Sequence, residues 1–138
     1  HSRSRRQRQM CIRDRYKRII IMSKGYLTTH VLDTYNGKPG SGIKGSLFKI
    51  DGENKVKISN FTLNEDGRCD EPILGKENFI LGKYELLFLC GSYFKEFTNL
   101  HEPFFLDDVI IRFGINKEEH YHVPLLITPW SYSTYRGS

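Results

Sequence analysis

The chain has 138 residues, of which 38% are hydrophobic and 13% aromatic, and it carries a formal charge of +5 at pH 7. A chain of this length and composition can bury one core, which excludes a disordered protein and favours a single globular domain. The positive charge lies in residues 1–21, which hold eight Lys and Arg and one Asp. Residues 22–138 hold 13 Lys and Arg and 15 Asp and Glu, so their net charge is −2. The charge of the main part of the chain therefore does not support a nucleic-acid partner.

The first 21 residues differ in character from the rest of the chain. Residues 5–15, RRQRQMCIRDR, match one reading frame of a transposon adaptor used in sequencing libraries. We therefore interpret residues 1–21 as a disordered, non-native basic extension and residues 22–138, which begin at Met22, as one domain. The alternative is a genuine basic arm that binds nucleic acid or an anionic membrane. The apolar run at residues 19–21 is too short for a signal peptide or a membrane span, so we expect no membrane partner and a cytoplasmic location.

Short segments rich in β-branched and aromatic residues follow one another along the domain, and residues that favour turns separate them. Strands are predicted at residues 27–33, 43–50, 56–63, 68–74, 82–90, 109–115, 121–127 and 132–136. One stretch, residues 91–99, can form a short helix. Because no long helix alternates with these strands, the pattern predicts an all-β fold, a two-sheet β-sandwich of seven or eight strands with one short helix.

The apolar residues of these strands predict the core and the state of the cysteines. The expected core residues are Leu27, Val31, Leu47, Phe61, Leu86, Phe88, Ile110 and Leu125. Cys69 and Cys90 match neither a disulfide framework nor a Cys-x-x-Cys motif, so we expect two free thiols. Pro124 cannot donate a hydrogen bond to a neighbouring strand, and we therefore predict a sheet edge or an interface beside His122.

Three histidines and one arginine are the candidate functional residues. His30 stands inside the first predicted strand, and His120 and His122 share one face of a later strand because side chains alternate. Together the three imidazoles could bind zinc, which is one alternative. The other interpretation is that neighbouring polar groups simply satisfy the ring nitrogens. Arg68 follows a turn, and it is either a solvated turn residue or a fixed cation that holds a carbonyl or an anion.

Four motifs read together are more specific than any single residue. The chain reads LTTHVLDT at residues 27–34, NEDGR at residues 64–68, HYHVPLL at residues 120–126 and YRGS at residues 135–138. With these motifs, residues 26–138 resemble the 5-hydroxyisourate hydrolase branch of the transthyretin-like family. The final YRGS is the most specific element, because the hormone-carrying transthyretins lack it.

The resemblance implies an activity and an assembly. The implied reaction is hydrolysis of 5-hydroxyisourate to 2-oxo-4-hydroxy-4-carboxy-5-ureidoimidazoline in urate degradation, with no metal and no organic cofactor. The implied assembly is a homotetramer whose active sites lie where two dimers meet. The alternative within the same fold is a non-catalytic carrier of a small ligand.

The resemblance also implies roles for individual residues. The catalytic residues would be His30, Arg68, His122 and Ser138, and the substrate-binding residues would be His30, Arg68, Tyr135, Arg136 and Gly137. A histidine would activate water and Arg68 would stabilise the oxyanion. Ser138 would bring its hydroxyl and the terminal carboxylate to the substrate. The sequence leaves open which histidine is the general base.

Overall fold

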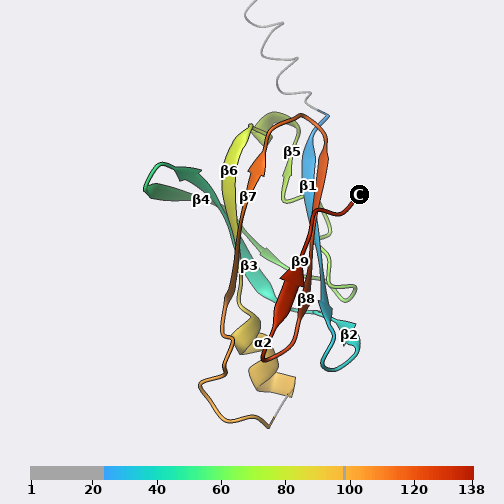
Figure 1. The fold of residues 1–138 in the computed structure, drawn as a ribbon. Coiled ribbons are helices and arrows are strands. Elements are labelled where there is room, and N and C mark those ends of the chain that lie inside the picture. Colours follow the sequence, from blue (N-terminus) through green and yellow to red (C-terminus); the bar gives the residue numbers. More distant parts are fainter. Residues whose placement is uncertain (1–23, 98) are drawn as a thin grey trace, which may run out of the picture.

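The structure is a computed structural model that describes residues 24–97 and 99–138. In this part of the chain, two β-sheets pack face to face and a short helix lies at one end of the sandwich (Figure 1). The elements are β1 Tyr26–Asp33, β2 Lys38–Pro39, β3 Lys44–Asp51, β4 Asn54–Thr62, β5 Leu74–Gly75, η1 Lys76–Asn78, β6 Gly82–Phe88, α2 Cys90–Phe97, β7 Val109–Ile115, β8 His120–Ile127 and β9 Tyr132–Thr134. The predicted all-β sandwich with one short helix is confirmed, and the predicted basic extension at residues 1–21 lies outside the described residues.

One strand pairing brings distant parts of the sequence together. The first sheet has the order β2-β1-β8-β9, with β5 also pairing with β1, and the second has the order β4-β3-β6-β7. Strands β1 and β8 are parallel, and their register sets Tyr26 opposite His120 and Thr28 opposite His122. Residues more than 90 positions apart in the sequence therefore share one stretch of sheet.

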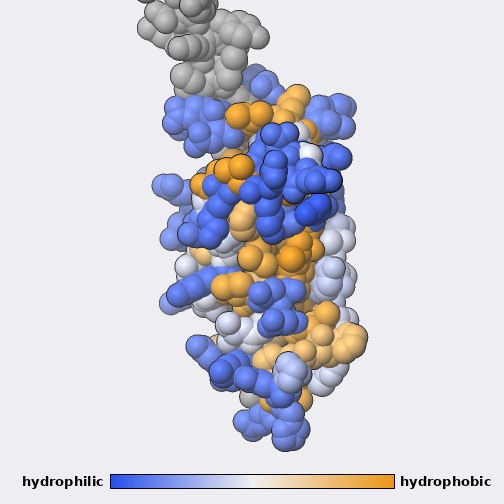
Figure 2. All heavy atoms as spheres, turned by 90° about the vertical axis from the view of Figure 1, so that its left-hand side faces the viewer, coloured by the Kyte–Doolittle hydropathy of each residue, from blue (hydrophilic) through white to orange (hydrophobic). Residues whose placement is uncertain are grey.

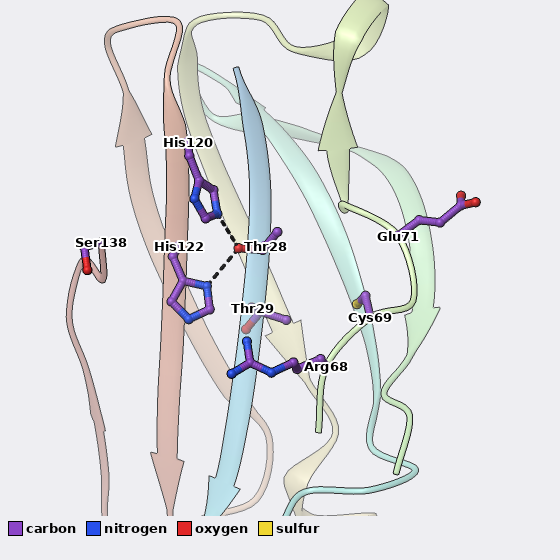
Figure 3. Close-up of a pocket in the computed structure, with 8 residues that line it drawn as sticks. All are labelled: Thr28, Thr29, Arg68, Cys69, Glu71, His120, His122 and Ser138. Atoms are coloured by element: carbon purple, nitrogen blue, oxygen red, sulfur yellow. Dashed lines mark hydrogen bonds between the residues drawn. The ribbon is translucent and has the colours of Figure 1, made fainter. Parts of the chain in front are cut away.

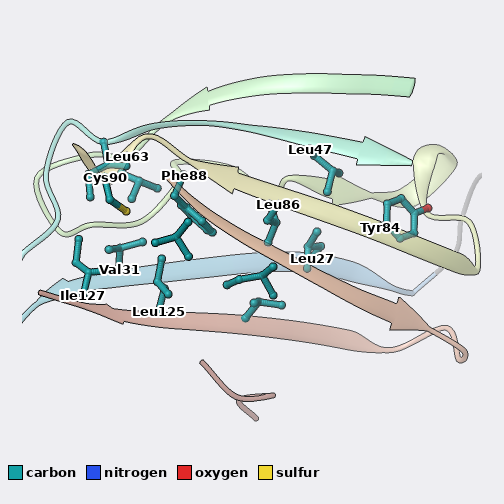
Figure 4. Close-up of a cluster of buried hydrophobic side chains, with 14 of the residues drawn as sticks. Leu27, Val31, Leu47, Leu63, Tyr84, Leu86, Phe88, Cys90, Leu125 and Ile127 are labelled. Atoms are coloured by element: carbon teal, nitrogen blue, oxygen red, sulfur yellow. The ribbon is translucent and has the colours of Figure 1, made fainter. Parts of the chain in front are cut away.

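Alternation along β1 decides what faces the core. Leu27, Thr29 and Val31 are at most 1% exposed, whereas Thr28 and His30 between them are partly exposed on the opposite face. The buried cluster fills the space between the two sheets (Figure 4). Burying these side chains supplies the main favourable free energy of folding. The outward face of β1 is left to polar groups.

Most of the predicted core is confirmed, but one member is wrong. Ile110 is 49% exposed, while its neighbours Val109 and Ile111 are buried. Three apolar residues in a row cannot all face inward from a strand, because successive side chains point to opposite faces. Phe61 packs against the core while remaining partly exposed. The outer face of the β4-β3-β6-β7 sheet accordingly shows a band of hydrophobic residues between hydrophilic ones (Figure 2).

Two further expectations need correction. Residues 68–74 do not form one strand: only Leu74 lies in β5, and Arg68 makes a single bridge with His30. The exposed Pro72 has no amide hydrogen for a ladder, which explains the break. The predicted sheet edge beside His122 is wrong, because β8 lies between β1 and β9, whereas the alternative of an interface there stays a prediction. Strand β8 tolerates Pro124 because its regular pairing with β9 begins only at Leu125.

Two buried acidic side chains are fully partnered. Asp33 accepts hydrogen bonds from the hydroxyl of Tyr93 at 2.7 Å and from the backbone and side chain of Asn36 at 2.9 and 2.8 Å. Glu85 accepts from Lys55 at 3.0 Å and from Arg112 at 2.9 Å. Burial raises the pKa of Glu85, but these two hydrogen bonds outweigh burial and hold its pKa below the ordinary value. Both carboxyl groups therefore stabilise the sandwich instead of serving a site.

The two cysteines within the described residues are free thiols, as the sequence predicts, with Cys90 buried and Cys69 partly exposed. No helix in the described part of the chain is long and apolar enough to cross a membrane.

Candidate active site

A pocket of about 360 Å³ lies on the outward face of β1 and β8. Its lining residues are Thr28, Thr29, Arg68, Cys69, Glu71, His120, His122 and Ser138. Three of the four predicted catalytic residues thus surround one cavity. Figure 3 shows Arg68 and Cys69 on one side of it, the two histidines in the middle and Ser138 on the other side.

The two histidines of β8 are joined through one hydroxyl. Thr28 Oγ1 lies 2.6 Å from His120 Nε2 and 2.8 Å from His122 Nδ1. The parallel register places Thr28 directly opposite His122, so the three side chains emerge on the same face (Figure 3). Tyr26 stacks on His120, with 4.0 Å between the ring centroids and 7° between the planes. Both imidazole rings are therefore fixed in orientation.

Arg68 reaches the site because a tight turn presses its segment against β1. Gly67 has a φ of +74°, and a Cβ there would lie 2.4 Å from the backbone oxygen of Val31, so this position requires glycine. The Val31 amide donates to the Gly67 carbonyl at 2.9 Å, which sets Arg68 opposite His30. Among the described residues, no carboxylate forms an ion pair with Arg68. Its guanidinium is available to an anionic ligand.

The pKa values of the histidines respond to burial and to Arg68. Burial first, and then the positive charge of Arg68, lower the pKa of both His30 and His122 from the ordinary value of 6.5. At His30 a hydrogen bond to the backbone carbonyl of Asp66 acts in the opposite direction. At His122 the nearby rings of His120 and His30 lower the pKa further. At neutral pH the rings of His30 and His122 are therefore uncharged and can accept a proton.

The last residues of the chain run along β8. The Gly137 amide donates to the His122 carbonyl at 2.8 Å, in the same register as the pairing of Leu125 with Thr134. A Cβ on Gly137 would lie 2.7 Å from His122 Cδ2, so a side chain there would collide with the ring. Gly137 thus belongs to the site through its lack of a side chain, and it carries Ser138 to the pocket.

The structure separates two predicted substrate-binding residues from this pocket. Tyr135 and Arg136 line a second pocket, of about 200 Å³, together with residues of β7 and β8. Arg136 pairs with Glu119 at 2.7 Å, and its guanidinium lies 4.0 Å from the centroid of the Tyr121 ring. Tyr135 is 60% exposed. Within one chain, these two residues do not meet His122 and Arg68 at a single cavity.

His120 and Thr28 are site residues that the sequence pattern does not reveal as such. The pattern offers His120 only as a metal ligand, and it does not distinguish Thr28 from other strand threonines. The zinc alternative does not fit, because the described residues contain no group of three or more His, Cys, Asp or Glu that could hold a metal ion. The His-x-His spacing was a sound signal for a shared face. It could not reveal the threonine, which comes from another strand.

Comparison with known proteins gives a consistent result. Residues 27–137 match the HIUase/Transthyretin family. A protein named 5-hydroxyisourate hydrolase from Pseudomonas aeruginosa is 53% identical over 116 residues, which covers 83% of this chain and 92% of that protein. The solved structure of a 5-hydroxyisourate hydrolase from Klebsiella pneumoniae is 31% identical, with a TM-score of 0.68 over 85% of this chain and 96% of that one. The structure of (S)-allantoin synthase is 45% identical with a TM-score of 0.78 over 84% of this chain, which spans only 44% of that protein.

Proposed function

The chain belongs to the HIUase/transthyretin family, and from this premise we propose that it is a hydrolase that opens the ring of 5-hydroxyisourate to give 2-oxo-4-hydroxy-4-carboxy-5-ureidoimidazoline in urate degradation, a part of purine catabolism. The proposal is supported most directly by two groups around one small pocket: the uncharged imidazole of His122, and the cation of Arg68, which forms no ion pair with a described carboxylate. A small heterocycle fits a cavity of about 360 Å³.

In the proposed reaction, an imidazole removes a proton from water while the water oxygen bonds to a ring carbonyl carbon. His122 lines the pocket and has its Nδ1 held by Thr28, so we assign it the role of base. His30, whose ring donates to the Asp66 carbonyl, orients the water. The carbonyl oxygen becomes an oxyanion, which the guanidinium of Arg68 stabilises. The carbon–nitrogen bond then breaks, and the leaving nitrogen takes the proton from His122.

Ser138 and Gly137 complete the proposed site. The hydroxyl of Ser138 can hydrogen-bond the bound ring, and Gly137 lets this segment approach His122. We further propose that Tyr135 and Arg136 bind substrate across a subunit boundary, because in one chain they face a different pocket. This requires the homotetramer that the family resemblance implies, with sites where two dimers meet. Light scattering of the purified chain tests this assembly, and a monomer would contradict it.

The decisive assay follows fresh 5-hydroxyisourate, generated from urate by urate oxidase, through its ultraviolet absorbance. The full chain should accelerate the decay over buffer alone, and His122→Ala should remove most of that acceleration. His101→Ala is the matched control, since His101 is an exposed histidine outside the pocket. If the folded full chain leaves the decay at the buffer rate, the proposed hydrolase activity is wrong and a ligand carrier becomes the better account.

A shortened chain tests the interpretation of the first 21 residues. We expect a chain that begins at Met22 to retain the activity of the full chain, because all eight residues that line the pocket lie after residue 24. Loss of activity on deletion would contradict the assignment of residues 1–21 as non-native. The cytoplasmic location stays a prediction, which fractionation of the source cells would test.

A further inference from the structure

The hydroxyl between the two histidines of β8 couples their protonation. A threonine hydroxyl has one hydrogen, so it can donate to one imidazole nitrogen and must accept from the other. Thr28 Oγ1 is 2.6 Å from His120 Nε2 and 2.8 Å from His122 Nδ1, which are both hydrogen-bond distances. If His122 carries its hydrogen on Nδ1, then Thr28 accepts from His122 and donates to His120. The tautomer of one ring therefore fixes that of the other.

His120 is held firmly enough to act as the far end of this chain. Its ring stacks on Tyr26 at 4.0 Å, and its backbone carbonyl accepts a hydrogen bond from Arg136 at 3.3 Å. The ring is partly buried in the wall of the pocket. Its position on β8 two residues from His122, and the register of β1, bring all three groups into line.

We propose that Thr28 and His120 form a proton relay behind His122, so that both are positioning residues for the proposed hydrolysis. The relay rests on the proposed function, since it deepens the role of the same site. In the forward step, His122 Nε2 takes the proton of water, His122 Nδ1 passes its hydrogen to Thr28 Oγ1, and Thr28 passes its own hydrogen to His120 Nε2. One proton enters and one moves at each link, so the water oxygen becomes a hydroxyl group on the carbon and His120 becomes the cation. When the leaving nitrogen takes the Nε2 proton of His122, the transfer runs back: His120 returns a proton to Thr28 Oγ1, and Thr28 returns one to His122 Nδ1.

The charges around the rings favour this transfer. Three basic groups lie near the His122 ring: Arg68 after its turn, His30 on β1 and His120 on β8. Burial first, and then all three groups, disfavour a positive charge on His122. Burial and then the charge of Arg136 lower the pKa of His120 too, but Arg68, which lowers the pKa of His122, does not act on His120, and Arg136 is paired with Glu119 at 2.7 Å. Moving the positive charge from His122 to His120 therefore takes it away from Arg68, which stays free to stabilise the oxyanion.

The remaining polar groups near the relay do not interrupt it. Glu71 and Cys69 line the same pocket, and burial raises the pKa of the Cys69 thiol to about 11, so it is uncharged at neutral pH. Tyr26 covers the other side of His120. Ser138 reaches the same pocket from the C-terminus with its hydroxyl and terminal carboxylate, so the polar groups around the two rings come from β1, β8, the segment after Arg68 and the last residue.

Substitution of Thr28 tests the relay directly. Thr28→Val keeps the shape and removes the hydroxyl, and we expect kcat to fall by about 10- to 100-fold with KM within about twofold, because a positioned acid–base group contributes 10²- to 10⁴-fold. Thr28→Ser restores the hydroxyl and should restore most of kcat. His120→Phe keeps a ring against Tyr26 without nitrogens, and it should match Thr28→Val. Thr34→Val is the control, since the Thr34 hydroxyl donates to Ile127 at 3.1 Å, away from the histidines.

A measurement that does not depend on activity completes the test. The ¹⁵N chemical shifts of the histidine rings report the tautomer, and we expect hydrogen on Nδ1 of both His122 and His120 in the wild type. In Thr28→Val we expect His122 to lose this preference while Thr34→Val keeps it. An unchanged His122 tautomer and an unchanged kcat in Thr28→Val would overturn the relay with the hydrolase activity intact. Absence of hydrolysis in the wild type would overturn the proposed function instead. In that case the ¹⁵N shifts alone would test the coupling through the Thr28 hydroxyl, and an unchanged His122 tautomer in Thr28→Val would overturn it.

Discussion

Replacing Gly137 with alanine should damage catalysis far more than stability. The added Cβ would lie 2.7 Å from His122 Cδ2, about 0.7 Å closer than the 3.4 Å at which ordinary contact begins. The Gly137 amide donates a hydrogen bond to the His122 carbonyl, so the end of the chain cannot easily move away from β8 and the ring has to turn. Turning it lengthens the 2.8 Å contact with Thr28 and moves the reactive nitrogen.

The size of the effect follows from this displacement. A misplacement of about 1 Å in a catalytic group can cost roughly 10²-fold, so we expect a 10- to 100-fold loss of kcat, or about 1.4–2.8 kcal/mol in the barrier. The free energy of unfolding should change by about 1 kcal/mol or less, because the site is at the surface. The ultraviolet decay assay measures kcat, and thermal unfolding measures stability.

Gly75→Ala is the matched control for this substitution. Gly75 lies in β5 outside both pockets, and a Cβ there would meet its nearest heavy atoms at 3.8 Å, which is ordinary contact. We expect this variant to keep the kcat of the wild type. If Gly137→Ala also keeps it, then the contact with His122 does not constrain the ring, and the assignment of His122 as the base loses its main geometric support.

Three further outcomes are expected. Arg68→Met should lower kcat by roughly 10²-fold, because the oxyanion loses its partner. Since Arg68 also lowers the pKa of His122, the acid limb of the pH profile of kcat/KM should move to higher pH in the variant. An acid limb that does not move would contradict the effect of Arg68 on His122. Tyr93→Phe removes a buried hydrogen bond to Asp33 and should cost about 2 kcal/mol, a fall of roughly 8 °C in melting temperature; an unshifted transition would exclude this contribution. The pKa of Glu85 is lowered in the folded chain, so its stabilising effect is present above the ordinary pKa of 4.5 and is lost as pH falls through the lower folded pKa. In urea unfolding, Glu85→Gln should be less stable than the wild type at pH 7, and the difference should shrink below about pH 4.5. A difference that stays constant with pH would refute this link.

The elements could be predicted well because each depends on local pattern. The strand Val109–Ile115 was predicted at the residues where it occurs, and the helix within one or two residues. The error at Ile110 had a local cause as well: a run of three apolar residues does not tell which of them face inward, and only the pairing partners decide that. The errors at residues 68–74 and at Pro124 concern pairing, which the sequence does not state.

In the candidate site too, features that depend on local pattern could be predicted and features that depend on strand pairing could not. Alternation correctly placed His120 and His122 on one face, and the motif around Arg68 correctly indicated a turn. The bridge through Thr28 depends on the register of two strands more than 90 residues apart, and a shift by one residue would turn Thr28 into the core. No local pattern contains that information. The separation of Tyr135 and Arg136 from the pocket has the same origin, since it depends on how the chain leaves β9.

The parallel pairing of β1 with β8 also sets a schedule for biosynthesis. The partners of Thr28 lie 92 and 94 residues further along the chain. At about 5–20 residues per second, a ribosome delivers β8 on the order of 5 to 20 s after β1. During that time the middle of β1 presents unpaired backbone groups on one side, which is the kind of edge that pairs wrongly with other chains. Among the strands that the structure describes, the one that carries His30 and Thr28 thus waits longest for its neighbour, and slower synthesis lengthens that exposure.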